Sequence, residues 1–178
     1  MKKIMFNDIY GLTQAVLDGR KTMMRRIVRK PKEVEINGHA YLNTEKLPYN
    51  VGDTVAIAQK YCELSWDKNF YDKLLGICKR LPQYELAGWD NKMFVSADLM
   101  PHHILITGIR VERLQNISDA DCLREGIMQS YDAYFYKGYT QHFNSAREAF
   151  ADLIGKICGR GTWPSNPYVF VYEFKLVD

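Results

Sequence analysis

The sequence predicts an α+β fold in which a small, mostly antiparallel sheet or barrel carries helices at its periphery. Two observations predict this class. The 178 residues contain at least four strand-like and three helix-like segments, and these segments do not follow the repeating strand–helix–strand order of a parallel α/β protein. The composition, 47% hydrophobic, 13% aromatic and 25% charged, suits one globular domain with a sizeable core and excludes fibrous and disordered classes.

A helix and a short strand open the chain. Apolar residues at helical spacing predict a helix over residues 8–18, and Gly19 is suited to end it because glycine adopts the left-handed conformation at low cost. Residues 26–29 then predict a brief strand, which Pro31 ends. The basic segment that starts at Arg20 therefore directly follows a helix C-terminus.

The middle of the chain predicts a hairpin, a core strand and an elaboration. An Asn-Gly pair between two short runs predicts a hairpin over residues 33–42. The compact apolar run 54–58 is typical of a core strand. Residues 62–100 give mixed signals, because the apolar residues from Trp66 onward fit a helix whereas 88–95 suggest a loop and a strand. We treat this stretch as an elaboration on the core.

The C-terminal part predicts the longest elements. Residues 104–114 form a strand candidate in which Gly108 marks a bulge. Two segments with a Ser followed three residues later by an acidic residue predict capped helices, a short one over 118–126 and a longer one over 145–157. The last segment, 168–176, alternates apolar and charged side chains and predicts a strand.

Positive charge is concentrated near the N-terminus. Residues 1–32 contain nine Lys and Arg side chains against Asp8 and Asp18, whereas acidic groups outnumber basic ones in the rest of the chain. Such asymmetry fits a polyanionic partner such as nucleic acid, and it equally fits a solvated charged face. Charge alone therefore leaves both interpretations open.

The cysteine spacing and the hydropathy indicate neither a zinc site nor a membrane-spanning segment. Four cysteines lie far apart, with no C-x-x-C pair and no histidine at zinc-finger spacing. No apolar stretch approaches the ~20 residues that a membrane-spanning helix needs. We expect a cytoplasmic protein with no membrane association, no metal site and no organic cofactor. The oligomeric state is left open.

Several segments in a fixed order resemble a known family. They are the run Gly19–Arg26 after the first helix, Gly52-Asp53 before a strand, the run Val111–Gly126 and the run Asn166–Phe174. This series resembles the ASCH domain family, in particular the longer version common in phages and prophages. The resemblance extends from the first helix to the C-terminus, and it covers residues 62–100 and 128–143 poorly. We expect a single domain over residues 1–178, with elaborations at about these two stretches.

The resemblance implies a PUA-like fold, which is a small β-barrel with helices at its rim and a cleft suited to RNA or a modified nucleoside. We therefore predict an RNA- or nucleotide-binding protein that uses a basic cleft. Arginine and lysine neutralise phosphates, and arginine adds bidentate contacts and stacking. The candidate ligand-binding residues are Lys21, Thr22, Arg25, Arg26 and Glu125.

Aromatic side chains near the cleft mouth would complete such a site. Tyr61, Trp163 and Tyr168 are candidates to stack on an unpaired base, because base–aromatic stacking is a general device for single-stranded nucleic acid. Ordinary packing in the core or at its rim is the alternative for each of them.

An amidohydrolase is the first alternative function. A short bacterial branch of the family hydrolyses N4-acetylcytidine with a Lys and a Thr of a G-x-K-x-x-T-x-R motif and a Glu from the later helix. By position, the Lys and Glu correspond to Lys21 and Glu125, which would be the catalytic pair, while Met24 occupies the position of the threonine. A thioether cannot do the work of a hydroxyl, although Thr22 would share a face with position 24 in an extended segment. A protein-interaction module that uses the tyrosine-rich stretch 131–142 is the third alternative.

Overall fold

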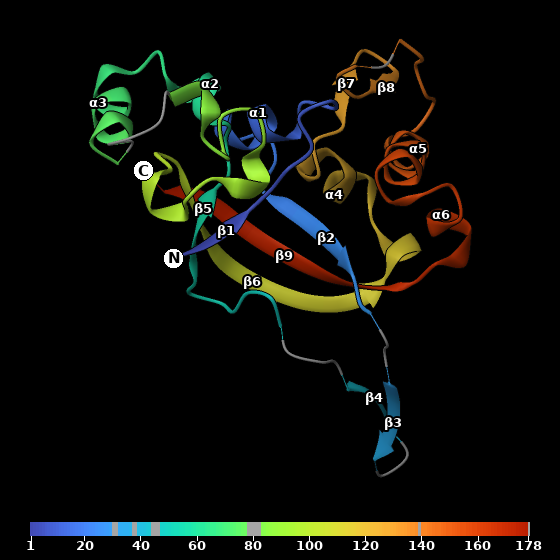
Figure 1. Cartoon of the computed structure of the whole chain (residues 1–178). Helices are drawn as coiled ribbons and strands as arrows, with labels where there is room; N and C mark the ends of the chain where they lie inside the picture. Colours follow the sequence, from blue (N-terminus) through green and yellow to red (C-terminus); the bar gives the residue numbers. More distant parts are fainter. Residues whose placement is uncertain (30–31, 37–38, 44–46, 78–82, 139, 178) are drawn as a thin grey trace.

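A five-stranded sheet forms the centre of the protein, which we describe from a computed structural model over residues 1–29, 32–36, 39–43, 47–77, 83–138 and 140–177 (Figure 1). Along the sheet the strands are β1 (Lys2–Ile4), β5 (Thr54–Ile57), β6 (His103–Arg113), β9 (Tyr168–Val177) and β2 (Met23–Ile27). Only the β1–β5 pair is parallel. The mostly antiparallel α+β class is thus confirmed, and within the described residues the sheet ends at β1 and β2 and does not close into a barrel.

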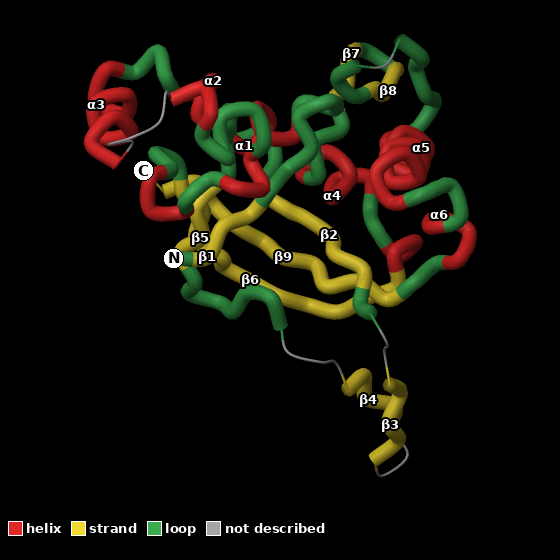
Figure 2. The backbone as a smooth tube through the Cα atoms, viewed as in Figure 1, coloured by secondary structure: helices red, strands yellow, loops and turns green. Residues whose placement is uncertain are grey.

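In Figure 2 the helices lie above the sheet and at its right-hand side, spread from the β5 end to the β2 end. The helices are α1 (Leu12–Leu17), α2 (Tyr61–Leu64), α3 (Lys68–Ile77), α4 (Asp119–Arg124), α5 (Ala146–Cys158) and α6 (Thr162–Ser165). Helix α4 packs against α5, and both contribute side chains to the main hydrophobic core. No helix among the described residues combines the length and the apolar character needed to cross a lipid bilayer.

Local signals in the sequence account for several boundaries. The Ser118 hydroxyl accepts a hydrogen bond of 3.1 Å from the Asp121 amide at the start of α4, and Ser145 does the same for the Glu148 amide at the start of α5. Gly19 follows α1 with φ of 72°, as predicted for a residue that ends a helix. These three elements begin or end where the sequence places their caps.

The four strands that the sequence predicts for the central sheet are observed, but β2 begins earlier than predicted and the sequence does not predict β1. The register between β6 and β9 shifts between Ile106 and Gly108, which confirms the predicted bulge. Strand β2 begins at Met23 and not at Arg26, because β9 pairs with it from Glu173 onward and buries Met23 completely. A partner strand about 150 residues away in sequence sets this boundary, so local sequence signals do not reveal it.

The predicted hairpin and the two predicted elaborations consist of short helices and strands. Strands β3 (Lys32–Ile36) and β4 (His39–Asn43) pair as the predicted hairpin, whose Asn-Gly turn lies outside the described residues. Helix α3 confirms the helical part of 62–100, although Trp66 precedes it and is 92% exposed. Residues 88–95 contain a 3-10 turn and no strand. In the second elaboration, β7 (Met128–Ser130) pairs with β8 (Ala133–Phe135).

Candidate nucleotide-binding cleft

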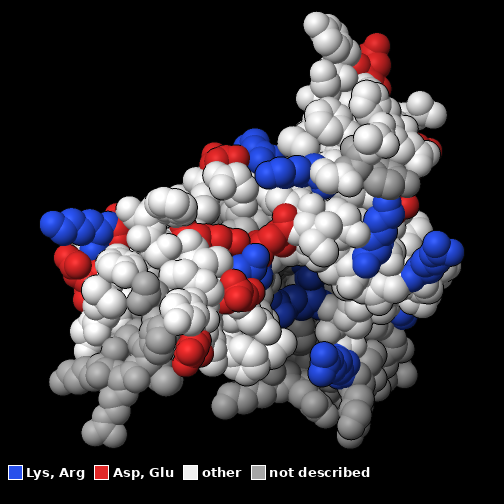
Figure 3. All heavy atoms as spheres, turned by 45° about the horizontal axis from the view of Figure 1, so that its top comes forward, with Lys and Arg blue, Asp and Glu red and all other residues white. Residues whose placement is uncertain are grey.

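A cleft of about 670 Å³ lies between β2, α5 and the loop that precedes α1. Most of its wall is apolar. The apolar lining residues are Met5, Phe6, Leu12, Met24, Ile27, Val28, Pro48, Phe150, Leu153, Ile154, Ile157 and Phe170. The charged lining residues are Lys21, Arg25, Arg26, Arg29 and Glu125. Figure 3 shows a hollow on this face with Lys and Arg side chains inside and beside it.

Lys21 and Glu125 form a buried ion pair that lines the cleft. Lys21 lies in the turn between α1 and β2, and Glu125 is the C-cap residue of α4. The distance from Lys21 Nζ to Glu125 Oε2 is 2.6 Å, and the two side chains are 3% and 6% exposed. The structure thus brings into contact two predicted site residues that lie 104 positions apart in the chain.

The hydrogen bonds of Lys21 identify its charge state. Nζ also donates to the main-chain oxygens of Met23 at 2.7 Å and of Glu125 at 2.8 Å, so three acceptors surround it. An ammonium group has three N–H donors, and all three are used here. Burial lowers the pKa of Lys21 from its ordinary value, and the Glu125 carboxylate opposes this change. The three acceptors match the three N–H donors of the ammonium form, which has no free lone pair.

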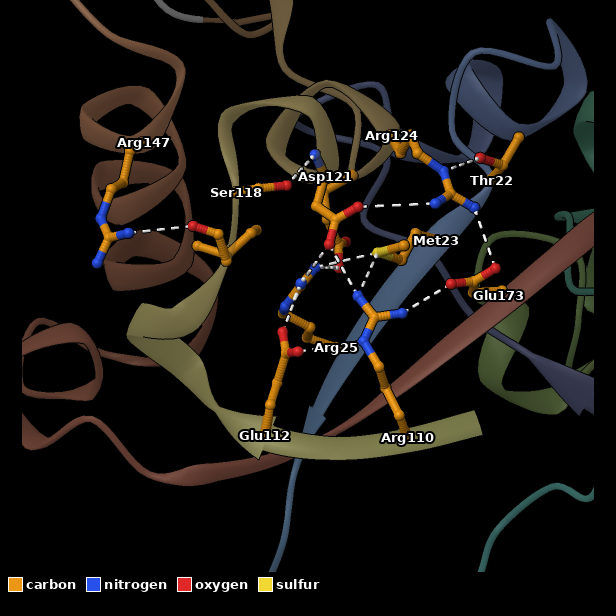
Figure 4. Close-up of polar contacts among 12 residues, drawn as sticks. Thr22, Met23, Arg25, Arg110, Glu112, Ser118, Asp121, Arg124, Arg147 and Glu173 are labelled. Carbon is orange, nitrogen blue, oxygen red and sulfur yellow. Dashed lines mark hydrogen bonds and ion pairs between the residues drawn. The ribbon is translucent and has the colours of Figure 1, made fainter. Parts of the chain in front are cut away.

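Arg25 is enclosed by carboxylates (Figure 4). Its side chain is 1% exposed, and its guanidinium nitrogens lie 2.8 Å from Glu112 Oε1, 3.2 Å from Asp121 Oδ2 and 3.0 Å from Glu125 Oε1. The charge pattern of the sequence suggests Arg25 as a phosphate contact, but three acidic partners occupy its guanidinium group. Its observed role is to hold Glu125 in place beside Lys21.

The ionic network continues across the sheet surface. Arg110 contacts Asp121 at 2.8 Å and Glu173 at 2.7 Å, and Arg124 contacts Glu173 at 3.4 Å (Figure 4). Arg110 and Glu112 lie on the face of β6 opposite Ile109 and Val111, as the alternation in the sequence indicates. The sequence gives no signal that Glu112 on this face, or Asp121 on α4, contacts Arg25, because these two partners lie 87 and 96 residues from it in the chain.

Arg26 and Arg29 differ from the other cations of the cleft. The Arg26 guanidinium lies over the Tyr49 ring, 5.7 Å from its centroid, and its Nε is buried. Among the described residues, Nε has no hydrogen-bond partner and neither arginine has an acidic partner within ion-pair distance. Arg29 is exposed at the cleft. These two side chains therefore supply positive charge that the described protein does not neutralise.

Positions 22 and 24, the two candidates for a hydroxyl at the site, lie in different surroundings. Met24 is 5% exposed and lines the cleft, so a thioether lies at the position where the ASCH resemblance would place a threonine. Thr22 is absent from the lining residues, and its hydroxyl accepts a hydrogen bond of 3.2 Å from Arg124 Nε. Four of the five predicted ligand-binding residues thus line the cleft, namely Lys21, Arg25, Arg26 and Glu125. Thr22, directly before β2, instead forms a hydrogen bond with α4.

The predicted stacking aromatics lie elsewhere. Tyr61 is buried in the cluster beneath the first elaboration, Trp163 packs edge-on against Phe150, and Tyr168 lies under the Arg113 guanidinium at 3.7 Å. None of the three lines the cleft, so this prediction is wrong. The aromatic rings at the cleft are Phe6, Phe150 and Phe170, whose apolar periodic positions mark them in the sequence only as core residues.

The first elaboration braces one wall of the cleft. Lys92 Nζ lies 2.7 Å from Asp8 Oδ1, and it also donates to the main-chain oxygen of Phe6 and to the Thr13 hydroxyl. Phe6 and Asn7 line the cleft, so Lys92 holds the loop that carries them. The elaboration therefore contributes to the shape of the site.

The second elaboration is fastened to α5. Tyr136 is fully buried, donates a hydrogen bond to Asp152 and stacks on Phe143. Burial, with the Asp152 carboxylate, raises the pKa of Tyr136 to about 12. By contrast, Tyr131 is 95% exposed. Of these two tyrosines, Tyr136 is therefore a core residue and Tyr131 lies at the surface.

Neither a metal centre among the described residues nor a known relative identifies the ligand of the cleft. Over the residues that the structure describes, no group of three or more His, Cys, Asp or Glu side chains is placed to hold a metal ion. Comparisons with protein-family models, curated proteins and solved structures find no match to this chain. Its own residues therefore have to indicate what the cleft binds.

Proposed function

We propose that this chain binds RNA or a nucleotide-like ligand in the cleft between β2 and α5, as a protein of the ASCH type. One observation carries the proposal: Arg26 and Arg29 stand at an apolar cleft without acidic partners among the described residues. A nucleotide has the complementary structure, because its phosphate is anionic and its base has flat apolar faces. The phosphate would pair with these arginines, and the base would lie among the phenylalanines.

The buried charges support binding by fixing the inner end of the cleft. Lys21, Glu125 and Arg25 satisfy one another, so their side chains do not need to move when a ligand enters. A preformed site avoids the free-energy cost of ordering side chains on binding. These residues are therefore positioning residues in this proposal.

The PUA-like relationship is part of the same proposal. Strands β6 and β9 are long, and the bulge at Gly108 increases the local twist of β6, which is a common device at the corners of barrels. The exposed edge of β2 and the first strand β1 are the two ends that a barrel would bring together.

An amidohydrolase is the second candidate because Lys21 and Glu125 are in contact at the cleft. Amide hydrolysis needs a base with a free lone pair and a nucleophile or activated water. The Lys21 Nζ donates to three acceptors, and Met24 offers no hydroxyl, so binding is the function that the geometry supports better. Turnover of N4-acetylcytidine by the wild type that is lost in Lys21→Ala would reverse this preference.

Fluorescence anisotropy with a short, labelled single-stranded RNA tests the binding proposal. We expect Arg26→Gln/Arg29→Gln to weaken binding at least tenfold and to reduce the slope of log K against log salt by about 0.7, the contribution of one neutralised phosphate of a single strand, since both arginines contact the same phosphate. Arg20→Gln is the matched control, because Arg20 is exposed and pairs with Asp18 away from the cleft lining. Equal affinity of all three proteins would contradict the proposal.

A further inference from the structure

The cleft runs along an unpaired strand edge. Strand β2 is the last strand of the sheet and pairs only with β9 among the described residues. Its other edge faces the space that α5 closes from the opposite side, since residues of both elements line the cleft. Unpaired main-chain N–H and C=O groups at a strand edge can form strong hydrogen bonds with a ligand or another chain.

The hydrogen bonds at the two ends of β2 identify which residues face the cleft with their main chain. The Val28 amide donates to the Tyr168 oxygen at 2.9 Å, and the Phe174 amide donates to the Thr22 oxygen at 3.0 Å. In an antiparallel pair the hydrogen-bonded positions alternate, so even-numbered residues of β2 bond to β9. The N–H and C=O groups of the odd-numbered residues, Met23, Arg25 and Ile27, therefore point away from β9.

Burial supports this orientation. The Arg25 side chain is 1% exposed, yet the residue as a whole is only half-buried. Its exposed surface is therefore main chain. The outward main-chain oxygen of Met23 accepts a hydrogen bond from Lys21 Nζ, so this group is not available to a ligand. Within the described chain, the Arg25 oxygen and the Ile27 amide have no hydrogen-bond partner.

The geometry points to main-chain recognition of a nucleobase. We infer that the Arg25 C=O accepts from, and the Ile27 N–H donates to, adjacent donor and acceptor atoms on the edge of the base, while Arg26 and Arg29 contact its phosphate. This inference rests on the proposed function and adds to it a chemical class: a nucleotide whose base presents an N–H beside an acceptor. Among the outward main-chain groups of Arg25 and Ile27, this acceptor and this donor lie on successive odd residues and match such an edge in polarity.

A nucleobase fits this edge better than an added peptide strand. Strand addition needs a row of free main-chain groups and pockets for alternate side chains. Here the Lys21 contact to Met23 limits the open edge to Arg25 and Ile27 among the described residues. The two arginines at the cleft also favour an anionic ligand.

Ile27→Pro removes the inferred donor and leaves the sheet intact. Proline is tolerated in an edge strand when its nitrogen faces away from the partner strand, as that of Ile27 does. Ile27 is 40% exposed as a whole residue, so the loss of its side chain affects packing little. Ile27→Ala is the matched control, because it truncates the side chain and keeps the N–H. Binding of AMP, CMP and ribose 5-phosphate to each protein is measured by calorimetry.

The expected result is that AMP or CMP binds the wild type and Ile27→Ala within threefold of each other, and binds Ile27→Pro at least tenfold more weakly. Ribose 5-phosphate, which lacks a base, should bind all three alike. Equal binding of AMP and CMP to the proline and alanine variants would overturn the inference and leave the proposed function standing. Wild-type protein that binds neither AMP, nor CMP, nor the labelled single-stranded RNA would overturn both.

Amide hydrogen exchange in the wild type provides a second measurement that does not depend on folding of the proline variant. The inference predicts that saturating AMP or CMP slows exchange of the Ile27 amide at least tenfold. The Arg26 amide is the internal control, since it already points to β9 and should change little. Unchanged exchange at Ile27 in the presence of bound nucleotide would overturn the inference.

Discussion

Breaking the Lys21–Glu125 pair should be far more damaging than breaking a pair at the surface. In Glu125→Gln the Lys21 ammonium stays buried, with 3% of its side chain exposed, and loses its carboxylate at 2.6 Å. Removing one partner of a buried ion pair costs about 3–5 kcal/mol, because the remaining charge is uncompensated. For a protein of this size that loss corresponds to a fall in Tm of roughly 10 °C. Arg25 also loses one of its three carboxylates.

A double-mutant cycle separates the pair from its surroundings. We expect Lys21→Met and Glu125→Gln to be less destabilising together than the sum of the two single changes, by about 2 kcal/mol. Urea unfolding followed by circular dichroism gives the free energy of unfolding of each variant. Asp18→Asn is the control, because the Asp18–Arg20 pair at 3.1 Å is exposed to solvent and its loss should change the free energy of unfolding little. Additive single effects below about 1 kcal/mol would refute the reasoning.

Three further predictions concern the elements around the site. Ser145→Ala should lower the free energy of unfolding by about 1 kcal/mol in urea titrations, because it removes the cap of α5, whereas Ser145→Asn should retain most of it. Gly126→Ala should cost at least about 1 kcal/mol by the same assay, since Gly126 has φ of +109° and its added Cβ would lie 2.9 Å from Leu12 Cδ2. The hydrogen bond from Lys2 lowers the pKa of Asp53 from its ordinary value of 3.8. The stability that this carboxylate contributes is therefore present above pH 3.8 and is lost as the pH falls through the folded-state pKa. An NMR titration should show that Lys2→Met raises the pKa of Asp53. An unchanged Asp53 titration would contradict that assignment.

The sequence predicts the elements that depend on local chemistry. The caps at Ser118 and Ser145, the helix end at Gly19 and the bulge at Gly108 all have signals within a few residues, and all are observed. The start of β2 depends on pairing with β9, so local signals place it three residues late.

The site follows the same division. The contact between Lys21 and Glu125 is expected from the family resemblance alone, since no local pattern joins residues 104 positions apart. Arg25 shows the converse case. Its neighbours in sequence are basic and suggest a phosphate site, but its partners in space are Glu112, Asp121 and Glu125. A run of positive charge therefore predicts a surface potential, whereas the fold decides which of its side chains stay free for a ligand.

Where a nucleotide binds is the most direct test of the central claim. Chemical-shift mapping of ¹⁵N-labelled protein during titration with AMP and CMP reports the location of the ligand. We expect large, saturable shifts for amides of the cleft, at Arg26, Ile27 and Leu153, and small ones at the remote, exposed Tyr131. Saturable shifts centred away from β2 and α5, or none with either nucleotide, would contradict the assignment of this cleft as the nucleotide site.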